Sequence, residues 1–182
     1  MRKESLDDFS PEWCQKLLNN PSYEQTGAGS RTVGGPTGKS SNSLIGKTLF
    51  TDHTLRAIRF LYKPKANERE FGGELLALVS LGDEICSHAN VLHGGINTTI
   101  IDEVSGGLAM RESVPHSLMA VNFTVKLRKS VKTPGIVLVR AWLDRKPEGR
   151  KVWVKCRTEQ DGITCIESES LYLHVGMSKA RL

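Results

Sequence analysis

A single long helical pattern set among strands most constrains the fold of this chain. Residues 94–110 place apolar side chains at helical spacing, with Ile96, Ile100, Val104 and Leu108 on one stripe. Shorter segments rich in branched and aromatic residues are predicted as strands at 55–62, 74–81, 117–127, 135–144, 151–158 and 163–175. One helix can bury its stripe among antiparallel strands if their sheet curves around it. The predicted fold is therefore α+β, with about six strands wrapped around one central helix.

A second stripe of this helix consists mostly of small residues. Its members are Gly95, Thr98, Thr99, Asp102, Ser105, Gly106 and Ala109. A glycine inside a helix costs about 1 kcal/mol relative to alanine. The pair Gly106-Gly107 therefore indicates that a ligand or another backbone comes close to this face of the helix.

The start of the helix carries the residues most indicative of chemistry. His93-Gly94-Gly95 lies where a helix N-terminus presents unpaired N–H groups and a partial positive charge. That arrangement suits a carbonyl oxygen that gains negative charge during a reaction. Asp102, about two turns later, suits a nucleophile or a general base acting on water. Glu103 is the second candidate acid, although it projects about 100° away around the helix.

Other reactive residues near this segment are expected to have structural roles. His93 is expected to cap the helix or brace the preceding loop, with general-base catalysis as the alternative. Cys86 has no recognisable activating base, so it is not predicted to be a nucleophile. No cluster of residues has the spacing of metal ligands, and no metal site is predicted.

Composition excludes several other classes of function. The chain has 182 residues, 38% hydrophobic and 25% charged, as expected for one globular domain without a membrane span. Its four cysteines form no Cys-x-x-Cys pair and are predicted to be free thiols. The net charge is +5, but aromatic residues make up 6% and no stacking motif accompanies the basic ones, so nucleic-acid binding is not expected.

The first 45 residues differ in composition from the rest of the chain. Ser10 is predicted to cap a helix with Pro11 at its first position. Residues 25–46 are rich in Gly, Ser, Thr and Pro, which predicts a long, mobile connection. The chain is accordingly divided into an N-terminal helix with a flexible extension (1–45), a main domain (46–176) and a C-terminal tail (177–182).

Residues 45–175 resemble the hotdog-fold thioesterases, particularly acyl-CoA thioesterases of the phenylacetate-pathway and mitochondrial long-chain types. The resemblance is carried by Leu92-His93-Gly94-Gly95, by Ile101-Asp102-Glu103, by Val-Asn-Phe-Thr-Val-Lys-Leu-Arg at 121–128 and by Glu-Gly-Arg-Lys at 148–151. It implies hydrolysis of acyl thioesters of coenzyme A or of an acyl carrier protein. Coenzyme A is then part of the substrate, and no cofactor is implied.

The resemblance also assigns roles by position. The amide of Gly94, with Gly95 close by, would polarise the thioester carbonyl, and Asp102 would attack or activate water. Many family members carry a Ser or Thr where this chain has Ala120. Asn122 is expected to share the strand face of Ala120 and is the candidate to stand in for that hydroxyl, whose absence puts the water-holding role in doubt.

Two further groups of residues are assigned supporting roles. Many members have an Asn upstream of His-Gly-Gly, at the position of Ser87, with His88 and Asn90 nearby as substitutes. A basic group, expected to contact coenzyme A phosphates or else to be solvated at strand ends, consists of Lys126, Arg128 and Lys129.

Two other functions remain open at this stage. One is a hotdog protein that binds acyl thioesters or regulates a partner without strong catalysis, which Ala120 favours and Asp102 disfavours. The other is a hydratase or dehydratase of the same fold, in which His88 or His93 would have to be the catalytic histidine.

The spacing of the two main site residues predicts an oligomer. Gly94 and Asp102 are eight residues apart on one helix, or roughly 12 Å. A polarised carbonyl and its attacking group must act within roughly 3–3.5 Å of one carbon. Two helices packed antiparallel through the small-residue stripe would solve this, as in the family's paired hotdogs, so we expect a homodimer or a dimer of dimers.

The last three residues, Ala180-Arg181-Leu182, are a conservative variant of the Ser-Lys-Leu peroxisomal address. No N-terminal targeting signal is recognisable. Peroxisomal localisation is therefore expected, with the cytoplasm as the alternative.

Overall fold

The computed structural model describes residues 7–27, 42–113 and 117–175. Most of the predicted mobile connection lies outside these ranges. The expected C-terminal address Ala180-Arg181-Leu182 also lies outside the described residues.

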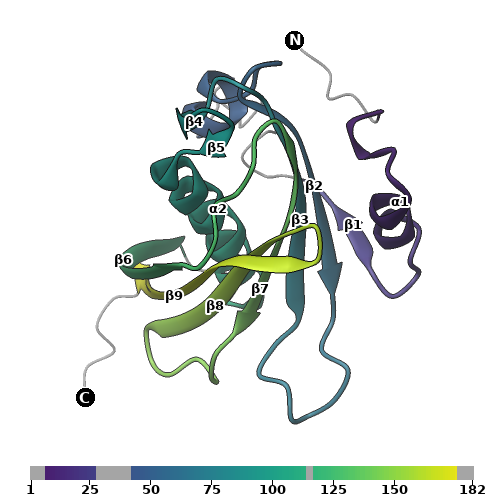
Figure 1. The fold of residues 1–182 in the computed structure, drawn as a ribbon. Coiled ribbons are helices and arrows are strands. Elements are labelled where there is room, and N and C mark those ends of the chain that lie inside the picture. Colours follow the sequence, from purple (N-terminus) through teal and green to yellow (C-terminus); the bar gives the residue numbers. More distant parts are fainter. Residues whose placement is uncertain (1–6, 28–41, 114–116, 176–182) are drawn as a thin grey trace.

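Within the described residues, one curved sheet wraps around one long helix, α2 (Gly94–Glu112), as Figure 1 shows. The sheet has seven antiparallel strands in the order β1 (Glu24–Thr26), β2 (Leu55–Lys63), β3 (Glu74–Leu81), β7 (Gly135–Leu143), β8 (Lys151–Gln160), β9 (Ile163–Val175) and β6 (Ser117–Leu127). The predicted fold class, a curved antiparallel sheet around one central helix, is confirmed.

Several short elements were not predicted from the sequence. They are the 3-10 helix η1 (Asp7–Phe9), the strand β1, the single-turn π-helix η3 (Leu44–Thr48) and the hairpin formed by β4 (Cys86–His88) and β5 (Val91–Leu92). Strands of two or three residues are too short to show an alternating pattern, so their pairing depends on neighbouring structure.

The apolar stripe of α2 forms the centre of the core. Ile100, Ile101, Val104 and Leu108 are almost fully buried against the concave face of the sheet. Burial of one such side chain stabilises a fold by about 1.5–3 kcal/mol. Ile96, predicted in the same stripe, is only partly buried, and Ile101 takes a central position instead.

The opposite face of the sheet is covered by the N-terminal segment, which Figure 1 shows beside β1 and β2. Helix α1 (Glu12–Leu18) begins one residue later than predicted: Pro11 is its N-cap residue, and the cap makes no side-chain hydrogen bond. Phe9 and Cys14 are completely buried, in a second apolar cluster with Leu61, Leu76 and Leu78. Strands β2 and β3 are therefore buried on both faces.

Removing the Phe9 side chain tests this outer layer. Phe9→Ala should lower the free energy of unfolding by about 3–5 kcal/mol, because a fully buried aromatic ring leaves a cavity. Trp13→Ala is the matched control, since Trp13 is 41% exposed on the neighbouring helix and should cost far less. Urea unfolding measures both, and equal effects would contradict a packed outer layer.

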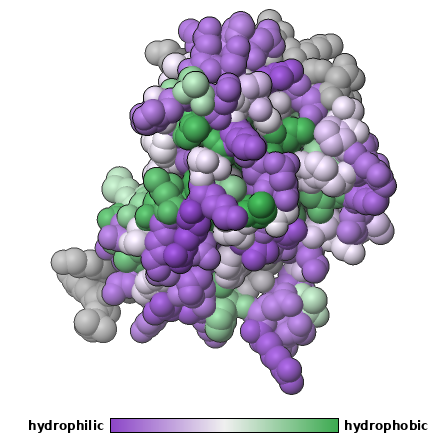
Figure 2. Space-filling view, in the orientation of Figure 1, coloured by the Kyte–Doolittle hydropathy of each residue, from purple (hydrophilic) through white to green (hydrophobic). Residues whose placement is uncertain are grey.

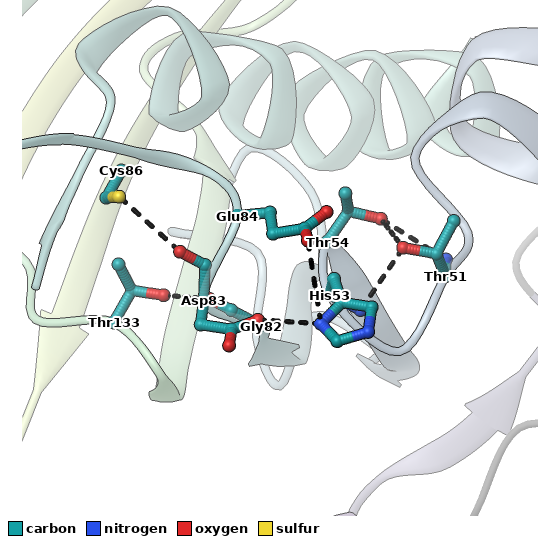
Figure 3. A network of polar contacts seen from close by, with 8 residues as sticks. All are labelled: Thr51, His53, Thr54, Gly82, Asp83, Glu84, Cys86 and Thr133. Atoms are coloured by element: carbon teal, nitrogen blue, oxygen red, sulfur yellow. Dashed lines mark hydrogen bonds and ion pairs between the residues drawn. The ribbon is translucent and has the colours of Figure 1, made fainter.

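A polar network fixes the loop that leads from β3 towards α2 (Figure 3). His53 Nδ1 lies 3.0 Å from Asp83 Oδ1, and the Glu84 amide donates to the His53 carbonyl at 2.8 Å. The Thr133 hydroxyl donates to the Gly82 carbonyl from the other side. A Cβ at Gly82 would collide with the His53 backbone, so glycine is required for this close approach. The network joins the segments before β2, after β3 and before β7.

The His53–Asp83 pair predicts a pH dependence of stability. The hydrogen bond to Asp83, followed by the charges of Glu84 and Asp83, raises the pKa of His53 above 6.5. Its contribution is therefore complete below about pH 6.5 and is lost as the pH rises through the higher folded pKa. His53 lowers the pKa of Asp83 below 3.8, so the Asp83 contribution is lost only as the pH falls through that lower value.

His53→Gln should accordingly reduce the urea midpoint near pH ~5.5 and much less near pH ~9. The effect should be small, because both side chains are well exposed. His88→Gln, which replaces another exposed histidine, is the control. A loss of equal size at both pH values would contradict a charged His53–Asp83 pair.

No helix in the described part of the chain combines the length and the apolar character needed to cross a membrane. All four cysteines lie within the described ranges and carry free thiols, as predicted.

Candidate active site

The Gly94 backbone N–H lies at the N-terminus of α2. His93 is the N-cap residue, and its Nδ1 accepts a hydrogen bond from the Gly95 amide at 2.9 Å, which is the capping role predicted for it. The Gly94 amide is the first of the helix and has no acceptor within it. A Cβ built at Gly94 would meet no atom of the described residues within 4 Å. Of the two glycines, Gly94 therefore offers its N–H to a ligand.

The position of this helix start is fixed by backbone hydrogen bonds. The His93 amide donates to the Ile85 carbonyl, and the Leu92 amide donates to the Val131 carbonyl, both at 2.9 Å. Because the loop from Arg128 to Val131 is tied to Leu92, the basic residues at the end of β6 lie at the same end of the molecule as Gly94.

Asp102 lies two turns further along α2, at the wall of an open cavity of about 900 Å³. Its Oδ1 accepts a hydrogen bond from the Tyr172 hydroxyl at 3.2 Å. Loss of solvent raises the pKa of the Asp102 carboxyl above 3.8, and the hydrogen bond from Tyr172 partly opposes this rise. Asp102 is nevertheless an exposed residue, so a substrate or water can reach it.

The walls of this cavity are mainly apolar. They include Phe60, Leu75, Leu118 and Met119, together with Gly106 and Gly107 of α2. A smaller cavity of about 290 Å³ lies on the outer face of β8 and β9, where Lys126, Arg157, Glu167 and Glu169 contribute to its lining. We assign the site to the larger cavity, because it combines apolar walls with a carboxylate of raised pKa.

The predicted stripe of small residues divides into two faces. Ser105 and Ala109 are completely buried against the sheet. Gly95 and Asp102 are exposed, and Gly106 is partly exposed. The accessible part of the stripe therefore runs from Gly95 past Asp102 to Gly106, and the Gly94 donor lies beside its start.

Asn122 does not share the face of Ala120, contrary to prediction. Ala120 pairs with Tyr172 and lines the cavity of Asp102. A β-bulge follows it, so Asn122 pairs with Leu171 on the outer face. The extra residue reverses the alternation, and the expectation that Asn122 replaces the missing hydroxyl beside Asp102 is wrong.

Glu103 lines the same cavity but is already engaged. The Asn42 side-chain amide donates to Glu103 Oε2 at 3.1 Å. Asn42 Oδ1 in turn accepts from the Ile45 amide, within η3. Glu103 therefore braces the segment that precedes β2, in keeping with its lower rank as a candidate acid.

The other predicted site residues lie near the start of α2 and outside the described lining of the Asp102 cavity. Ser87 and His88 contact each other on β4, at 3.2 Å between Oγ and Nδ1. Asn90 occupies the hairpin turn at φ 59°, and its carbonyl accepts from the Thr133 amide at 3.0 Å. These side chains are exposed beside the helix start.

The basic group at the end of β6 is exposed as well. Arg128 is paired with Glu167 through Nε at 3.0 Å and Nη2 at 2.8 Å. Lys126 lies opposite Glu167 in the register of β6 and β9. Lys129 is exposed in the loop that follows. Across the described ranges, no three His, Cys, Asp or Glu side chains are arranged to hold a metal ion.

Known proteins share this fold and part of the sequence. The acyl-coenzyme A thioesterase THEM4 of Mus musculus is 35% identical over 81 residues, which are 44% of this chain and 31% of that protein. A phenylacetic acid degradation-related protein from Ralstonia eutropha, assigned as a thioesterase, superposes with a TM-score of 0.52 at 18% identity, over 62% of this chain and 83% of that one.

A Bacillus halodurans protein solved with CoA superposes with a TM-score of 0.50 at 17% identity, over 55% of this chain and 66% of that one. No protein-family model matches the sequence. This chain has the hotdog fold of the thioesterases. The fold expected from the resemblance of residues 45–175 is thereby confirmed. The chain spans only about a third of the length of THEM4.

Within this hotdog, Tyr172 and Ser105 lie behind Asp102, and the sequence assigned neither of them a role at the candidate site. Tyr172 is 3% exposed, and its hydroxyl lies 2.7 Å from Ser105 Oγ and 3.2 Å from Asp102 Oδ1. Strand β9 turns Ser168, Ser170 and Tyr172 inward, while Leu171 and Leu173 are less buried. Hydrophobicity alone would have favoured the opposite orientation.

Proposed function

We propose that this chain hydrolyses acyl thioesters to a free acid and a thiol. The observation that carries the proposal is the combination, on one helix, of an open N-terminal amide at Gly94 and a cavity-lining carboxylate at Asp102. The partial identity to an acyl-coenzyme A thioesterase supports this reaction. The Bacillus halodurans structure with CoA supports a coenzyme A thioester as substrate, with an acyl-carrier-protein thioester as the alternative.

The active site is proposed to form between two copies of the chain. Eight helical residues separate Gly94 from Asp102, or roughly 12 Å, so one helix cannot place both on one carbon. Figure 2 shows apolar side chains gathered on the side where β6 lies, and Met119, Val121 and Leu127 of that edge strand are exposed. An antiparallel partner at this edge would bring its Gly94 towards Asp102. A dimer of dimers is the larger alternative.

In the proposed reaction, the thioester carbonyl accepts a hydrogen bond from Gly94 of one copy. Asp102 of the other copy takes a proton from water, and the hydroxide attacks the carbonyl carbon. The resulting oxyanion is stabilised by the same amide and the helix dipole. Collapse breaks the C–S bond, and the proton on Asp102 passes to the departing sulfur. The raised pKa of Asp102 favours such proton uptake and return. Direct attack by the carboxylate, giving an acyl–enzyme anhydride, is the alternative.

The apolar cavity walls provide a place for the acyl group, beside Phe60, Leu75 and Met119. The exposed basic group near Gly94 would face the phosphates of coenzyme A, with Lys126 and Lys129 more available than the paired Arg128. A panel of acyl-CoA and acyl-carrier-protein thioesters, assayed by release of free thiol, tests the proposed function. Absence of hydrolysis across the panel would reject it.

A binding protein without catalysis is the second candidate, because Ala120 supplies no hydroxyl beside Asp102. A chain that binds acyl-CoA but releases no thiol would support this candidate. Catalysis by His93 in a hydratase is disfavoured, since its Nδ1 accepts the hydrogen bond from Gly95.

Asp102→Asn should lower kcat by at least about a hundredfold, because the amide cannot take up a proton. Glu103→Gln is the matched control on the same cavity, and its effect should be much smaller because Glu103 is engaged with Asn42. Steady-state kinetics and a thermal melt of each variant make the comparison. Similar, small losses would show that Asp102 is not the reacting acid.

The Gly94 amide can be removed without removing the helix start. Proline lacks the N–H but fits the first helical position, and the preceding His93 has an extended ψ of 131°, which proline tolerates. Gly94→Pro should lower kcat by about 10²–10³-fold, as expected for one lost oxyanion donor. Gly94→Ala adds a Cβ in open space and keeps the N–H, so it should stay at least ~10-fold more active than the proline variant. Equal losses would contradict the donor role.

Mixing the two inactive chains tests the shared site. Asp102→Asn and Gly94→Pro chains, denatured and refolded together, should recover activity, because a heterodimer has one site with both intact groups. Each variant refolded alone is the control. Failure of the mixture to exceed either parent, when heterodimers are demonstrated by native mass spectrometry, would reject a site formed between copies.

A further inference from the structure

A short chain of hydroxyl groups lies behind Asp102. The Tyr172 hydroxyl is 3.2 Å from Asp102 Oδ1 and 2.7 Å from Ser105 Oγ. Ser105 Oγ is in turn 2.6 Å from the Ile101 carbonyl, one helical turn earlier. Ser105 is completely buried and Tyr172 nearly so. The chain therefore runs from the cavity into the interior of the protein.

The hydrogen bonds that link Asp102, Tyr172 and Ser105 can all point in either of two directions. Each hydroxyl has one proton, and its oxygen can both donate and accept. When Asp102 is ionised, Ser105 can donate to Tyr172, and Tyr172 to the carboxylate. When Asp102 is protonated, its O–H can donate to Tyr172, Tyr172 to Ser105, and Ser105 to the Ile101 carbonyl. In both arrangements, each hydroxyl proton of Tyr172 and Ser105 has an acceptor.

We propose that Tyr172 and Ser105 form a reversible hydroxyl relay that positions Asp102 and hydrogen-bonds it in both of its protonation states. This inference rests on the proposed function, in which Asp102 takes up a proton and returns it within each turnover. Tyr172 is a positioning residue, because it acts on the reaction through Asp102. Rotation of two O–H groups reverses the relay, with no movement of heavy atoms and no bond broken.

The surroundings make this relay the main polar influence on the Asp102 carboxyl. On α2, Glu103 contacts Asn42, and Arg111 is paired with Glu24 more than two turns away. From β6, Ala120 and Leu118 contribute no charge. From β8, burial raises the pKa of the Cys156 thiol to about 12, so that thiol is neutral. Burial also raises the pKa of Tyr172 well above its ordinary value, so its hydroxyl stays protonated.

The two relay residues should shift the titration of Asp102 in opposite directions. Tyr172→Phe removes the donor to the ionised carboxylate, and the lost charge-assisted bond should raise the pKa of Asp102. Ser105→Ala leaves the Tyr172 proton only the backbone carbonyl of Asp102, 3.4 Å away, as an acceptor when Asp102 is protonated. This longer bond is a poorer substitute for the bond to Ser105, so the protonated state is disfavoured and the pKa of Asp102 should fall. A purely structural role of the two residues predicts no such opposition.

The experiment measures kcat/KM against pH for the wild type and both variants. The midpoint of the fall in kcat/KM at acidic pH should shift to higher pH by at least ~0.5 unit in Tyr172→Phe. It should shift to lower pH by a similar amount in Ser105→Ala. Tyr62→Phe is the control, because it removes another tyrosine–carboxylate bond, 2.6 Å to Glu112 at the far end of α2, and should leave the midpoint unchanged. Shifts of the same sign, or none, would overturn the relay.

A readout independent of turnover separates the relay from the proposed function. The carboxyl carbon of Asp102, assigned with the Asp102→Asn variant, can be titrated by ¹³C NMR in each full-length chain. The same opposed shifts are expected there even if no thioester is hydrolysed. Should Tyr172→Phe not fold, the downward shift in Ser105→Ala decides alone, and an unchanged or raised value would reject the relay.

Discussion

The burial of α2 within the concave sheet is the constraint on which the rest of the structure depends. A helix packed into a concave sheet cannot change its depth without displacing the core, and both ends of α2 are held by hydrogen bonds as well. His93 caps the start, while Glu112 near the end accepts from the Tyr62 hydroxyl and the Gly73 amide. Between these anchors, Gly94 and Asp102 have set positions relative to the cavity. The same packing that stabilises the fold therefore orients both candidate reacting groups.

Sequence reasoning succeeded where a pattern was long and local. The helix starting at Gly94 and the strand at 74–81 were predicted correctly, because the apolar spacing of one and the continuous apolar run of the other leave little ambiguity. It failed for Asn122, because one extra residue in a bulge reverses every later side chain, and a bulge has no strong local signature. Tyr172 was not predicted at the site because β9 turns it inward with Ser168 and Ser170, whereas the apolar Leu171 and Leu173 are less buried.

The candidate site was predictable only in part, because only some of its residues belong to a local sequence pattern. The proposed roles of Gly94 and Asp102 follow from a motif on one helix, and helical geometry relates their positions without further information. The hydrogen-bond partner of Asp102, Tyr172, comes from β9, which is distant in sequence, and no local pattern relates it to the helix. The N-terminal layer is similar: Phe9 covers Leu61 and Leu76 from a segment whose composition gave no sign of docking.

The two edges of the described sheet differ in a way that limits how large an assembly can grow. β6 is an edge of eleven residues with exposed apolar side chains, whereas β1, at the other edge, has three residues. Long flat edges recruit further strands, and very short ones do not. Two copies joined through β6 would have β1 and the part of β2 that β1 does not pair, residues 55–59, at both outer ends of the described sheet. Further strands would find only these short edges, which protects such a sheet from open-ended, fibre-like polymerisation.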